Sequence, residues 1–343
     1  MPPHKPQQVI VTAFGGIENL QVQQVASQSP GPDEVAITLT SIGMNQADLM
    51  ARRGEYRLSS GEPPFTPGIE GGGKITAIGT NVRDRKVGQR VILTLGAVAG
   101  KGTYRTEFIA KSQETIPIPA GIDDTLIGAL WLPFMTAWGA LAWRQNLQPG
   151  QTVLLPAASS SVAIAASQIV KALGGITIGT TTSPAKVEAL QALAAAQYDH
   201  IVVTSSKVKQ PTTQQPWWRT VKKLTKGKGL DVIFDPVAAG EFLHHEIRLL
   251  AHGGTLWIYG LLGTPDTIDV SPLIRKDASI RGWLLNFIVG TPAEIEGYQH
   301  ILENVAAGNY ALPIAARFPL EQVRAAHTEM EAGGHIGKYV LTP

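Results

Sequence analysis

The residues that most clearly suggest chemistry lie in the segment TVLLPAASSSVAIAASQIVKALGG, residues 152–175. A short apolar run leads into a turn of very small residues, and an apolar stretch with helical spacing follows. Ala158, Ser160 and Ala163 occupy the three positions that glycine holds in a dinucleotide-binding turn. Small side chains there let backbone N–H groups at the helix start approach a pyrophosphate. The segment therefore predicts a dinucleotide site, although a strand–helix turn capped by serine would explain the same residues.

The end of the next predicted strand indicates which dinucleotide binds. An enzyme that uses NAD usually has a carboxylate about 20 residues after the turn, where it binds the ribose 2′-hydroxyl. Residues 178–186 read IGTTTSPAK and contain neither Asp nor Glu. The hydroxyl groups of Thr181 and Thr182 and the ammonium group of Lys186 could instead receive a 2′-phosphate, so NADPH is favoured. Lys186 could equally be an ordinary residue on a helix surface.

Cysteine is absent from the whole chain. Disulfides, thiol nucleophiles and thiolate-bound zinc or iron–sulfur clusters are therefore excluded. The eight histidines are not spaced as metal ligands, and the adjacent pair His244 and His245 would point in different directions on a helix. We expect no bound metal.

Length and charge limit the remaining classes of function. A chain of 343 residues, 44% of them hydrophobic, is long enough for two domains. Its net charge of +2 is too small to predict binding to nucleic acid. No stretch approaches the roughly 20 apolar residues of a membrane span, and the amino terminus has no signal-peptide core. We expect a cytoplasmic protein without membrane insertion.

The pattern of apolar residues predicts two kinds of structure along the chain. Up to about Pro119, short β-branched runs separated by Gly, Pro, Asp and Asn are typical of a turn-rich, largely antiparallel domain; the runs are Val9–Thr12, Glu34–Ile42, Lys74–Ile78, Arg90–Leu95 and Tyr104–Ala110. After about Asp124, alternating strand and helix patterns indicate a parallel sheet; the predicted helices there are Ile127–Arg144, Ser161–Leu173, Pro184–Ala196, Pro216–Lys226 and Glu241–Ala251, and the predicted strands are Thr152–Leu155, Ile176–Gly179, His200–Val203, Val232–Asp235 and Thr255–Tyr259. Residues 207–216, KVKQPTTQQP, predict a polar loop. The tail after about Gly290 is too short to form a domain alone and should return to the first one.

An ordered set of motifs resembles one family over essentially the whole chain. The motifs are GMNQADLMARRGEY (43–56), PFTPGIEGGGKITAIGTNV (64–82), VGQRV (87–91), Thr136-Ala137-Trp138, AASSSV (157–162), GLDVIFDPV (229–237) and GKYVL (337–341). Together they are similar to the zinc-independent medium-chain dehydrogenase/reductase family, of the quinone oxidoreductase or 2-enoyl-thioester reductase type. Zinc-dependent relatives would have cysteine where Asn45 stands and histidine where Ile69 stands. The family usually keeps glycine where Ser160, Ser161 and Ala163 stand, so the cofactor turn departs from its pattern.

The resemblance implies a fold and an activity. The fold is α/β: a Rossmann doubly wound parallel sheet plus a GroES-like β-rich catalytic domain split between the two ends of the chain. We expect the catalytic domain at 1–125 and 291–343 and the NADPH-binding domain at 126–290. The implied activity is NADPH-dependent hydride transfer to a quinone or an α,β-unsaturated carbonyl, an enone or enoyl thioester, without zinc. An NADPH-binding protein of low activity and a zinc-free alcohol dehydrogenase-like enzyme are the alternatives.

The resemblance also implies roles for particular residues. Without a metal, hydrogen-bond donors must stabilise the negative charge that develops on the acceptor oxygen. Tyr56 is the expected donor, and Asn45 would orient substrate or nicotinamide. Tyr56 could instead be a packed aromatic, and Asn45 a turn-forming residue. Expected cofactor contacts are Gln46, Asp48, Thr136, Ala158, Ser159, Ser160, Ser161, Val162, Thr181, Thr182, Lys186, Gly260, Leu261 and Lys338.

Two apolar segments predict a homodimer. Thr255–Leu262 and Ser279–Leu285 would leave an apolar sheet edge exposed in a monomer, and the resemblance implies dimers formed by sheet extension. The expected partners are therefore a small-molecule electron acceptor and a second copy of the chain.

Overall fold

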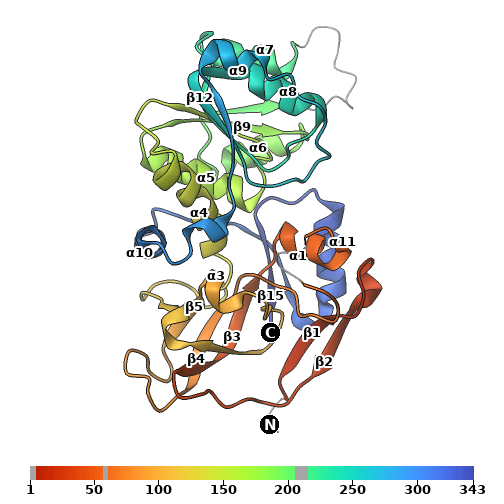
Figure 1. Ribbon diagram of the computed structural model, residues 1–343, viewed down its shortest axis with the longest axis vertical. Coiled ribbons are helices and arrows are strands. Elements are labelled where there is room, and N and C mark those ends of the chain that lie inside the picture. The colour runs from red at the N-terminus through yellow and green to blue at the C-terminus, as the bar shows by residue number, and fades with distance from the viewer. Residues whose placement is uncertain (1–4, 57–60, 205–214) are drawn as a thin grey trace. The chain divides into compact units, whose positions relative to one another are not determined.

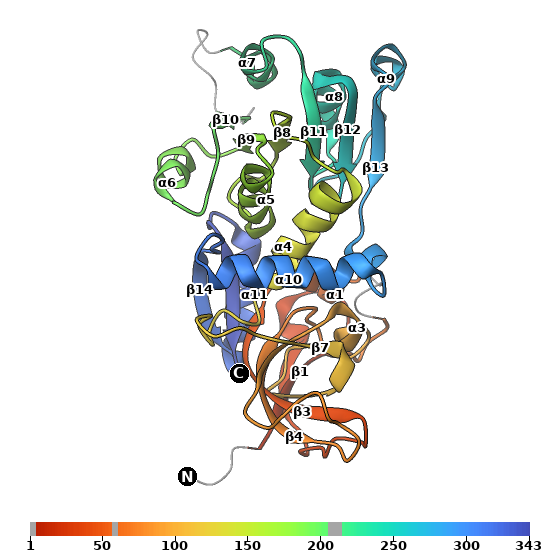
Figure 2. The ribbon, with the colours of Figure 1, turned by 90° about the vertical axis from the view of Figure 1, so that its left-hand side faces the viewer.

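The computed structural model describes residues 5–56, 61–204 and 215–343 (Figure 1, Figure 2). The chain forms two compact units, which we call unit 1 (Met1–Leu132, Glu294–Asn309 and Pro313–Pro343) and unit 2 (Pro133–Ala293 and Tyr310–Leu312). The predicted bounds of 1–125, 126–290 and 291–343 stay a prediction, because compactness does not show which segments fold on their own. Most of the polar loop predicted at 207–216 lies outside the described residues.

Unit 1 is built around a mainly antiparallel sheet. The strand order is β14-β15-β3-β4-β5-β7, with β6 also paired to β3. The carboxy-terminal strand β15 pairs with β3 through Val340 opposite Gly43 and Leu341 opposite Ile42, so the two ends of the chain share one sheet. The bounds are β3 (Glu34–Gly43), β4 (Gly72–Ile78), β5 (Arg90–Leu93), β6 (Glu107–Lys111), β7 (Thr115–Pro117), β14 (Ile314–Pro319) and β15 (Lys338–Thr342), and a hairpin joins β1 (Gln7–Val11) to β2 (Leu20–Gln24).

Short helices accompany this sheet. They are α1 (Gln46–Arg53), α3 (Leu95–Val98), α10 (Pro292–Ala306) and α11 (Val323–Ala332), with 3-10 turns η1 (Ile17–Asn19), η2 (Ser112–Glu114) and η5 (Leu320–Gln322). Alternate residues of β3, such as Val35, Ile37 and Leu39, enter one hydrophobic core with residues of α11. This alternation is the period-two pattern of a sheet with one covered face.

Unit 2 is a six-stranded parallel sheet with the order β10-β9-β8-β11-β12-β13. In chain order this is 3-2-1-4-5-6, the doubly wound arrangement in which dinucleotides bind where the order reverses. The reversal falls between β8 and β11. The strands are β8 (Thr152–Leu155), β9 (Ile176–Thr181), β10 (His200–Val203), β11 (Leu230–Asp235), β12 (Leu250–Ile258) and β13 (Ser279–Gly282). The helices are α4 (Trp131–Trp138), η3 (Gly139–Arg144), α5 (Ser161–Ala172), α6 (Lys186–Ala192), α7 (Trp217–Leu224), α8 (Gly240–Leu249), α9 (Ser271–Lys276) and η4 (Leu285–Ile288).

The predicted fold class is confirmed: a doubly wound parallel sheet accompanies a β-rich part made from both ends of the chain. In the parts of the chain that the structure describes, no helix is long and apolar enough to cross a membrane.

Some predicted element bounds were wrong, for local reasons. The helix predicted over Ile127–Arg144 begins only at Trp131, because the backbone of Gly128 is hydrogen-bonded to β3: its N–H donates to the Ser41 hydroxyl and its carbonyl accepts from the N–H of Gly43, both at 2.7 Å. The second half of that helix is a π-helix, η3. The helix predicted to reach Ala251 ends at Leu249, and β12 starts at the next residue. These bounds depend on packing between distant segments, which apolar spacing does not encode.

His327 of α11 is buried without polar partners. The side chain is fully inaccessible, and neither ring nitrogen has a hydrogen-bond partner among the described residues. Its ring meets the ring of Tyr104 edge to face, with centroids 5.9 Å apart. Burial lowers the pKa of His327 to about 3, and the charges of Arg52 and Arg53 add to this. The imidazole is therefore neutral at physiological pH and acts as a packing residue.

This burial predicts acid sensitivity that a substitution should remove. Between pH 6.5 and about 3 the unfolded chain binds a proton at His327 that the folded chain refuses, so the wild type loses stability as the pH falls through this range. At pH 5 the loss at this site should be about 2 kcal/mol. His327→Leu removes it. Urea unfolding at pH 7 and at pH 5 measures this. The free energy of unfolding of the variant, relative to that of the wild type, should rise by this amount between pH 7 and pH 5. If it were the same at both pH values, the assignment would be contradicted.

Candidate active site

The turn after β8 has the geometry of a phosphate-binding loop. Ala157 adopts a left-handed backbone conformation with φ of 53°, which is strained for a residue with a side chain. Ser160 caps α5, and its hydroxyl accepts a hydrogen bond from the N–H of Ala163 at 3.2 Å. The first turn of any helix leaves N–H groups without intrahelical partners, and these can bind an anion. The predicted loop residues Ser159, Ser160, Ser161 and Val162 are half-buried and Ala158 is buried.

Two tyrosine hydroxyl groups form hydrogen bonds with this loop. The Tyr198 hydroxyl donates to the Ala158 carbonyl at 2.8 Å. Gly179 of β9 makes room for that ring, because a Cβ there would lie 2.9 Å from Tyr198 Cδ1. Tyr259, which follows β12, makes a side-chain hydrogen bond with Ser160. The loop is therefore held by residues next to β10 and β12 as well as by β8.

Lys186 lies at the phosphate loop. It starts α6, and its ammonium group donates to the Ser159 hydroxyl at 3.0 Å. The side chain is half-buried, and this burial lowers its pKa. Thr181 ends β9 and is only 6% exposed, and its hydroxyl accepts from the N–H of Ser183, whereas Thr182 is exposed. Lys186 therefore contacts the phosphate loop through Ser159, whereas an ordinary lysine on a helix surface would have no such contact.

A second strained turn follows β11 on the other side of the reversal point. Asp235 accepts hydrogen bonds from the N–H groups of Val237 and Ala238, both at 2.7 Å, and Ala238 has a left-handed φ of 48°. Buried Glu246 of α8 lies beside this carboxylate. Burial and the neighbouring Asp235 charge raise the pKa of Glu246 well above its usual range. Burial also raises the pKa of Asp235, against the lowering effect of its hydrogen bonds from Val237 and Ala238.

The remaining predicted residues of unit 2 lie close to these turns or on α4. Gly260 packs on the turn after β11, because a Cβ there would lie 2.8 Å from the Pro236 carbonyl oxygen. Leu261 follows it and is 55% exposed. Thr136 of α4 is 8% exposed, and its carbonyl accepts from the indole N–H of Trp283 at 2.9 Å. That indole also packs against Gly139.

In unit 1, a buried polar cluster surrounds Asn45. Lys338 of β15 forms an ion pair with Glu70, with Nζ and Oε2 2.7 Å apart, and these side chains are 1% and 0% exposed. The same ammonium group donates to Asn45 Oδ1 at 2.6 Å. Asn45 Nδ2 donates to Glu70 at 3.3 Å and to the Gly43 carbonyl at 3.2 Å. Both ends of the Asn45 amide are therefore fixed.

Glu70 and Asp48 connect this cluster to two helices. The second oxygen of Glu70 accepts from the N–H of Leu132 at 3.0 Å and so caps α4. Asp48 Oδ2 accepts from the N–H of Asn45 at 2.8 Å at the start of α1, and the Tyr104 hydroxyl donates to the same oxygen at 3.1 Å. Burial raises the pKa of Asp48 to about 7, against the lowering effects of its hydrogen bonds and of Lys338.

This arrangement assigns structural contacts to two predicted cofactor ligands. Asp48 is 1% exposed and Lys338 is 2% exposed, and they form hydrogen bonds with other side chains and backbone of unit 1. They position Asn45, and their predicted contact with a cofactor stays a prediction. Gln46, the first residue of α1, is half-buried.

Tyr56 follows the end of α1. Helix α1 ends at Gly54, whose φ of 82° is left-handed, and a Cβ there would lie 2.9 Å from the Phe14 ring. Only Gly fits both constraints, and the chain then turns to place Tyr56 two residues later. The ring is half-buried, and burial raises the pKa of its hydroxyl. The phenol is therefore protonated at neutral pH and can donate a hydrogen bond.

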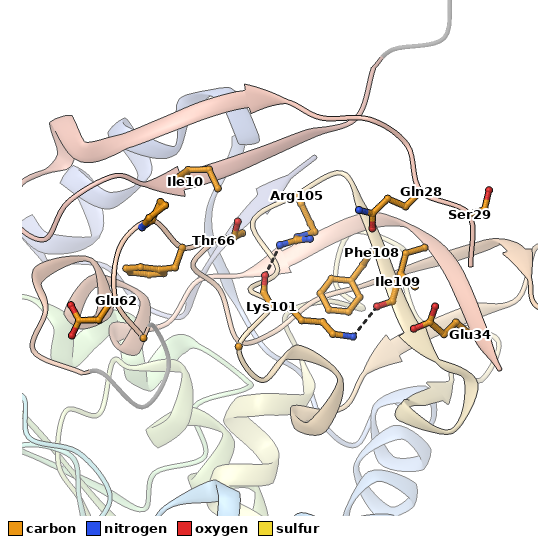
Figure 3. Close-up of a pocket in the computed structure, with 14 residues that line it drawn as sticks. Ile10, Gln28, Ser29, Glu34, Glu62, Thr66, Lys101, Arg105, Phe108 and Ile109 are labelled. Atoms are coloured by element: carbon orange, nitrogen blue, oxygen red, sulfur yellow. Dashed lines mark hydrogen bonds between the residues drawn. The ribbon is translucent and has the colours of Figure 1, made fainter. Parts of the chain in front are cut away.

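A wide cavity of about 970 Å³ in unit 1 lies apart from these groups (Figure 3). Arg105 and Lys101, which border it, pack over the Phe108 ring at 5.6 and 5.7 Å, and Lys101 donates to the Ile109 carbonyl. None of the predicted site residues lines it. In the described ranges, no group of three or more His, Cys, Asp or Glu side chains is arranged to hold a metal ion.

Sequence reasoning did not identify several supporting residues. The sequence patterns give no supporting role to Glu70, Gly179, Tyr198, Glu246 or Tyr259. Their partners lie far away along the chain, so no local pattern reports them. Glu70 within a run of glycines was the clearest available signal, because a charged residue there needs a buried partner.

Comparisons with known proteins agree with a fold made of a GroES-like part and a dinucleotide-binding sheet. The family model described as an alcohol dehydrogenase GroES-like domain matches residues 31–120, and the one described as zinc-binding dehydrogenase matches residues 161–304. A 2-haloacrylate reductase of Burkholderia sp is 30% identical over 97% of this chain and 98% of its own. A quinone oxidoreductase of Pongo abelii is 30% identical over 97% and 96%. The crystal structure of Escherichia coli quinone oxidoreductase complexed with NADPH is similar in fold, with a TM-score of 0.85 at 23% identity, and covers 98% of this chain and 100% of its own.

The buried pair of Lys338 and Glu70 predicts a specific mutational pattern. Lys338→Met leaves the Glu70 charge buried without its counter-charge and should cost about 3–5 kcal/mol of unfolding free energy. Removing both charges, in Glu70→Gln combined with Lys338→Met, should recover most of that loss. Urea unfolding of the two variants and the wild type checks this. If the double variant were as unstable as the single one, the ion pair would not be the source of the loss.

Proposed function

Because this chain belongs to the medium-chain dehydrogenase/reductase family, of the quinone oxidoreductase type, we propose that it transfers hydride from NADPH to a quinone or an α,β-unsaturated carbonyl compound without zinc. The family makes it an oxidoreductase with a nicotinamide cofactor. NADPH, the acceptor class and zinc independence are the proposed parts. The observation that carries the choice of NADPH is the contact of Lys186 with Ser159 in a segment, 178–186, that has no carboxylate.

The residues of the loop fit a phosphorylated dinucleotide. The small side chains after β8 leave space for phosphate oxygens near the first turn of α5, and Lys186 provides a positive charge at the same loop. NADPH would supply the hydride. The protein's residues would hold it: N–H groups of Ser161 and Val162 for the pyrophosphate, and Thr182 with Lys186 for the 2′-phosphate.

The residues of unit 1 fit a reaction in which an oxygen becomes negative. A conjugated carbonyl that accepts hydride at its β-carbon becomes an enolate, and a neutral phenol can stabilise it by donating a hydrogen bond. The raised pKa keeps Tyr56 in that protonated form. Asn45, with its amide held by Lys338 and Glu70, would orient the substrate or the nicotinamide.

The names of relatives support the acceptor class. One relative is called a reductase of a 2-haloacrylate, an α,β-unsaturated acid, and another a quinone oxidoreductase. Both acceptors take hydride at a carbon or oxygen conjugated to a carbonyl and need stabilisation of an oxyanion. The absence of cysteine from the chain supports a mechanism without thiolate-bound zinc.

Cofactor preference gives the first test. The wild type should bind NADPH at least tenfold more tightly than NADH, a difference of about 1.4 kcal/mol. Thr182→Asp should narrow or invert this ratio, since a carboxylate repels the 2′-phosphate. Thr182 is preferable to Thr181, which is buried and accepts a backbone hydrogen bond. Fluorescence titration measures the affinities, with Thr182→Asn as the uncharged control of equal size. Equal affinities of the wild type for both cofactors would refute the preference.

Tyr56→Phe tests the proposed donor. The variant should keep its affinity for NADPH and its melting temperature but lose about 10²-fold in turnover with an enone or enoyl thioester, the scale of one missing oxyanion donor. A quinone should be affected less, because reduced quinones can take protons from water. Steady-state kinetics with both acceptor classes measures this. Loss of thermal stability together with cofactor affinity would show that Tyr56 is a packing residue instead.

We also propose a homodimer formed through the edge of the sheet in unit 2. Strand β13 is the last strand of that sheet, and the connection between β12 and β13 carries several exposed large apolar residues: Leu261, Leu262, Ile268, Val270 and Ile274. An uncovered edge with apolar side chains favours pairing with a second copy.

Light scattering at micromolar concentration should therefore give twice the mass of the chain. Ile274→Asp, at the most exposed of these side chains (83%), should weaken the dimer at least tenfold. Ile295→Asp is the matched control, because Ile295 is 52% exposed but lies outside this connection. A wild type that is strictly monomeric, or equal effects of both changes, would rule out this interface.

A further inference from the structure

A basic pocket lies in unit 2 near the amino-terminal ends of β11 and β12, whereas the phosphate loop follows the carboxy-terminal end of β8. The cofactor turns follow the carboxyl ends of β8, β9 and β11, whereas this pocket surrounds the residues that lead into β11 and β12. Its volume is about 390 Å³, within the range of small-molecule sites. Its lining includes Lys222, Lys228, His245, Arg248, His252 and Lys276.

The charge of this lining is one-sided. It contains three lysines, one arginine and two histidines, and no Asp or Glu. The cations come from different segments: Lys222 from the last turn of α7, Lys228 from the turn before β11, Arg248 from the last turn of α8, and Lys276 from the last turn of α9. Helix α8 packs against both α7 and α9 (Figure 1). Like charges from separate elements therefore converge on one hollow.

Cations at helix ends also have a purely structural explanation, because the carboxyl end of a helix carries partial negative charge. Lys276 partly serves this purpose, since its ammonium group donates to the carbonyls of Arg248 and Leu250, both at 2.6 Å. Each helix end is equivalent to roughly half a negative charge. The ends of α7 and α8, together with Asp269 at 3.7 Å from Arg248, offset about two of the four positive charges.

The remaining charge is not compensated within the described residues. Lys222 and Lys228 are exposed and have no ion pair or hydrogen bond from their ammonium groups among them. Lys222 and Arg275 add to burial in lowering the pKa of Lys276, which shows that these positive charges repel one another. Structural neutralisation of helix ends explains part of the cluster, and an anion would explain the rest.

We propose that this pocket binds a small molecule through a diphosphate group, at a site separate from the cofactor turns. A diphosphate has closely spaced negative oxygens that several ammonium and guanidinium groups can contact at once. The side chains of Lys222 and Lys228 supply movable point charges, and Arg248 supplies a fork of N–H donors. This inference does not depend on the proposed reductase activity.

Titration calorimetry with inorganic pyrophosphate tests the proposal, using protein saturated with NADPH so that the cofactor turns cannot take up the probe. One additional molecule should bind per chain. Lys222→Gln combined with Lys228→Gln should weaken this binding at least tenfold while leaving the NADPH affinity and the melting temperature unchanged. Lys223→Gln combined with Lys226→Gln is the matched control, because these two lysines are exposed on the same segment but do not line the pocket.

The control pair should leave pyrophosphate binding within about twofold of the wild type. Titration with ADP in place of pyrophosphate shows which kind of molecule carries the diphosphate. Tighter binding of ADP than of pyrophosphate indicates that the ligand is a nucleotide, and equal binding indicates that only the diphosphate is recognised. Either result supports the site. Absence of pyrophosphate binding would overturn the proposal. Equal weakening by the two lysine pairs would also overturn it, because it would show diffuse attraction to a basic surface.

Discussion

The buried contact of Lys338 with Glu70 and Asn45 is the interaction on which unit 1 depends. Lys338 belongs to the carboxy-terminal strand, and Asn45 and Glu70 belong to the amino-terminal part of the chain. Burying an ammonium group and a carboxylate is costly, and only close pairing with further hydrogen bonds offsets the cost. The geometry supplies those bonds, because Glu70 also accepts from the start of α4 and Asn45 starts α1. One ion pair thus fixes the strand pairing that closes the sheet, the start of two helices and the orientation of the Asn45 amide.

In unit 2 the corresponding constraint is the strained geometry of the two turns that follow the carboxyl ends of β8 and β11. Ala157 and Ala238 both adopt left-handed conformations that cost about 1–3 kcal/mol each. Such strain persists only where surrounding contacts hold it, and Tyr198, Tyr259 and the Asp235 carboxylate provide them.

Much of the fold could be predicted from the sequence, because the spacing of apolar residues and the turn residues indicate the strands and helices locally. The apolar runs that became β8, β9 and β11 and the small-residue turn before α5 have the spacing of a doubly wound sheet, and the strand order confirmed it. Local patterns did not show where α4 begins, since this depends on the hydrogen bonds of Leu132 to Glu70 and of Gly128 to β3. The sequence also did not predict that Lys338 and Asp48 hold Asn45, and their predicted contact with the cofactor stays a prediction. Thr181 and Thr182 looked equivalent in the sequence, and only burial distinguishes them.

The central claim is that hydride passes from NADPH to the β-carbon of a conjugated carbonyl. The most direct measurement uses NADPH carrying deuterium at C4 of the nicotinamide, prepared separately as both stereoisomers, with a simple enone as acceptor. Mass spectrometry and NMR of the product then locate the label. Deuterium at the β-carbon of a saturated ketone, delivered from one of the two stereoisomers, is the predicted result. Deuterium at the carbonyl carbon of an alcohol, or no transfer from either stereoisomer, would contradict the account.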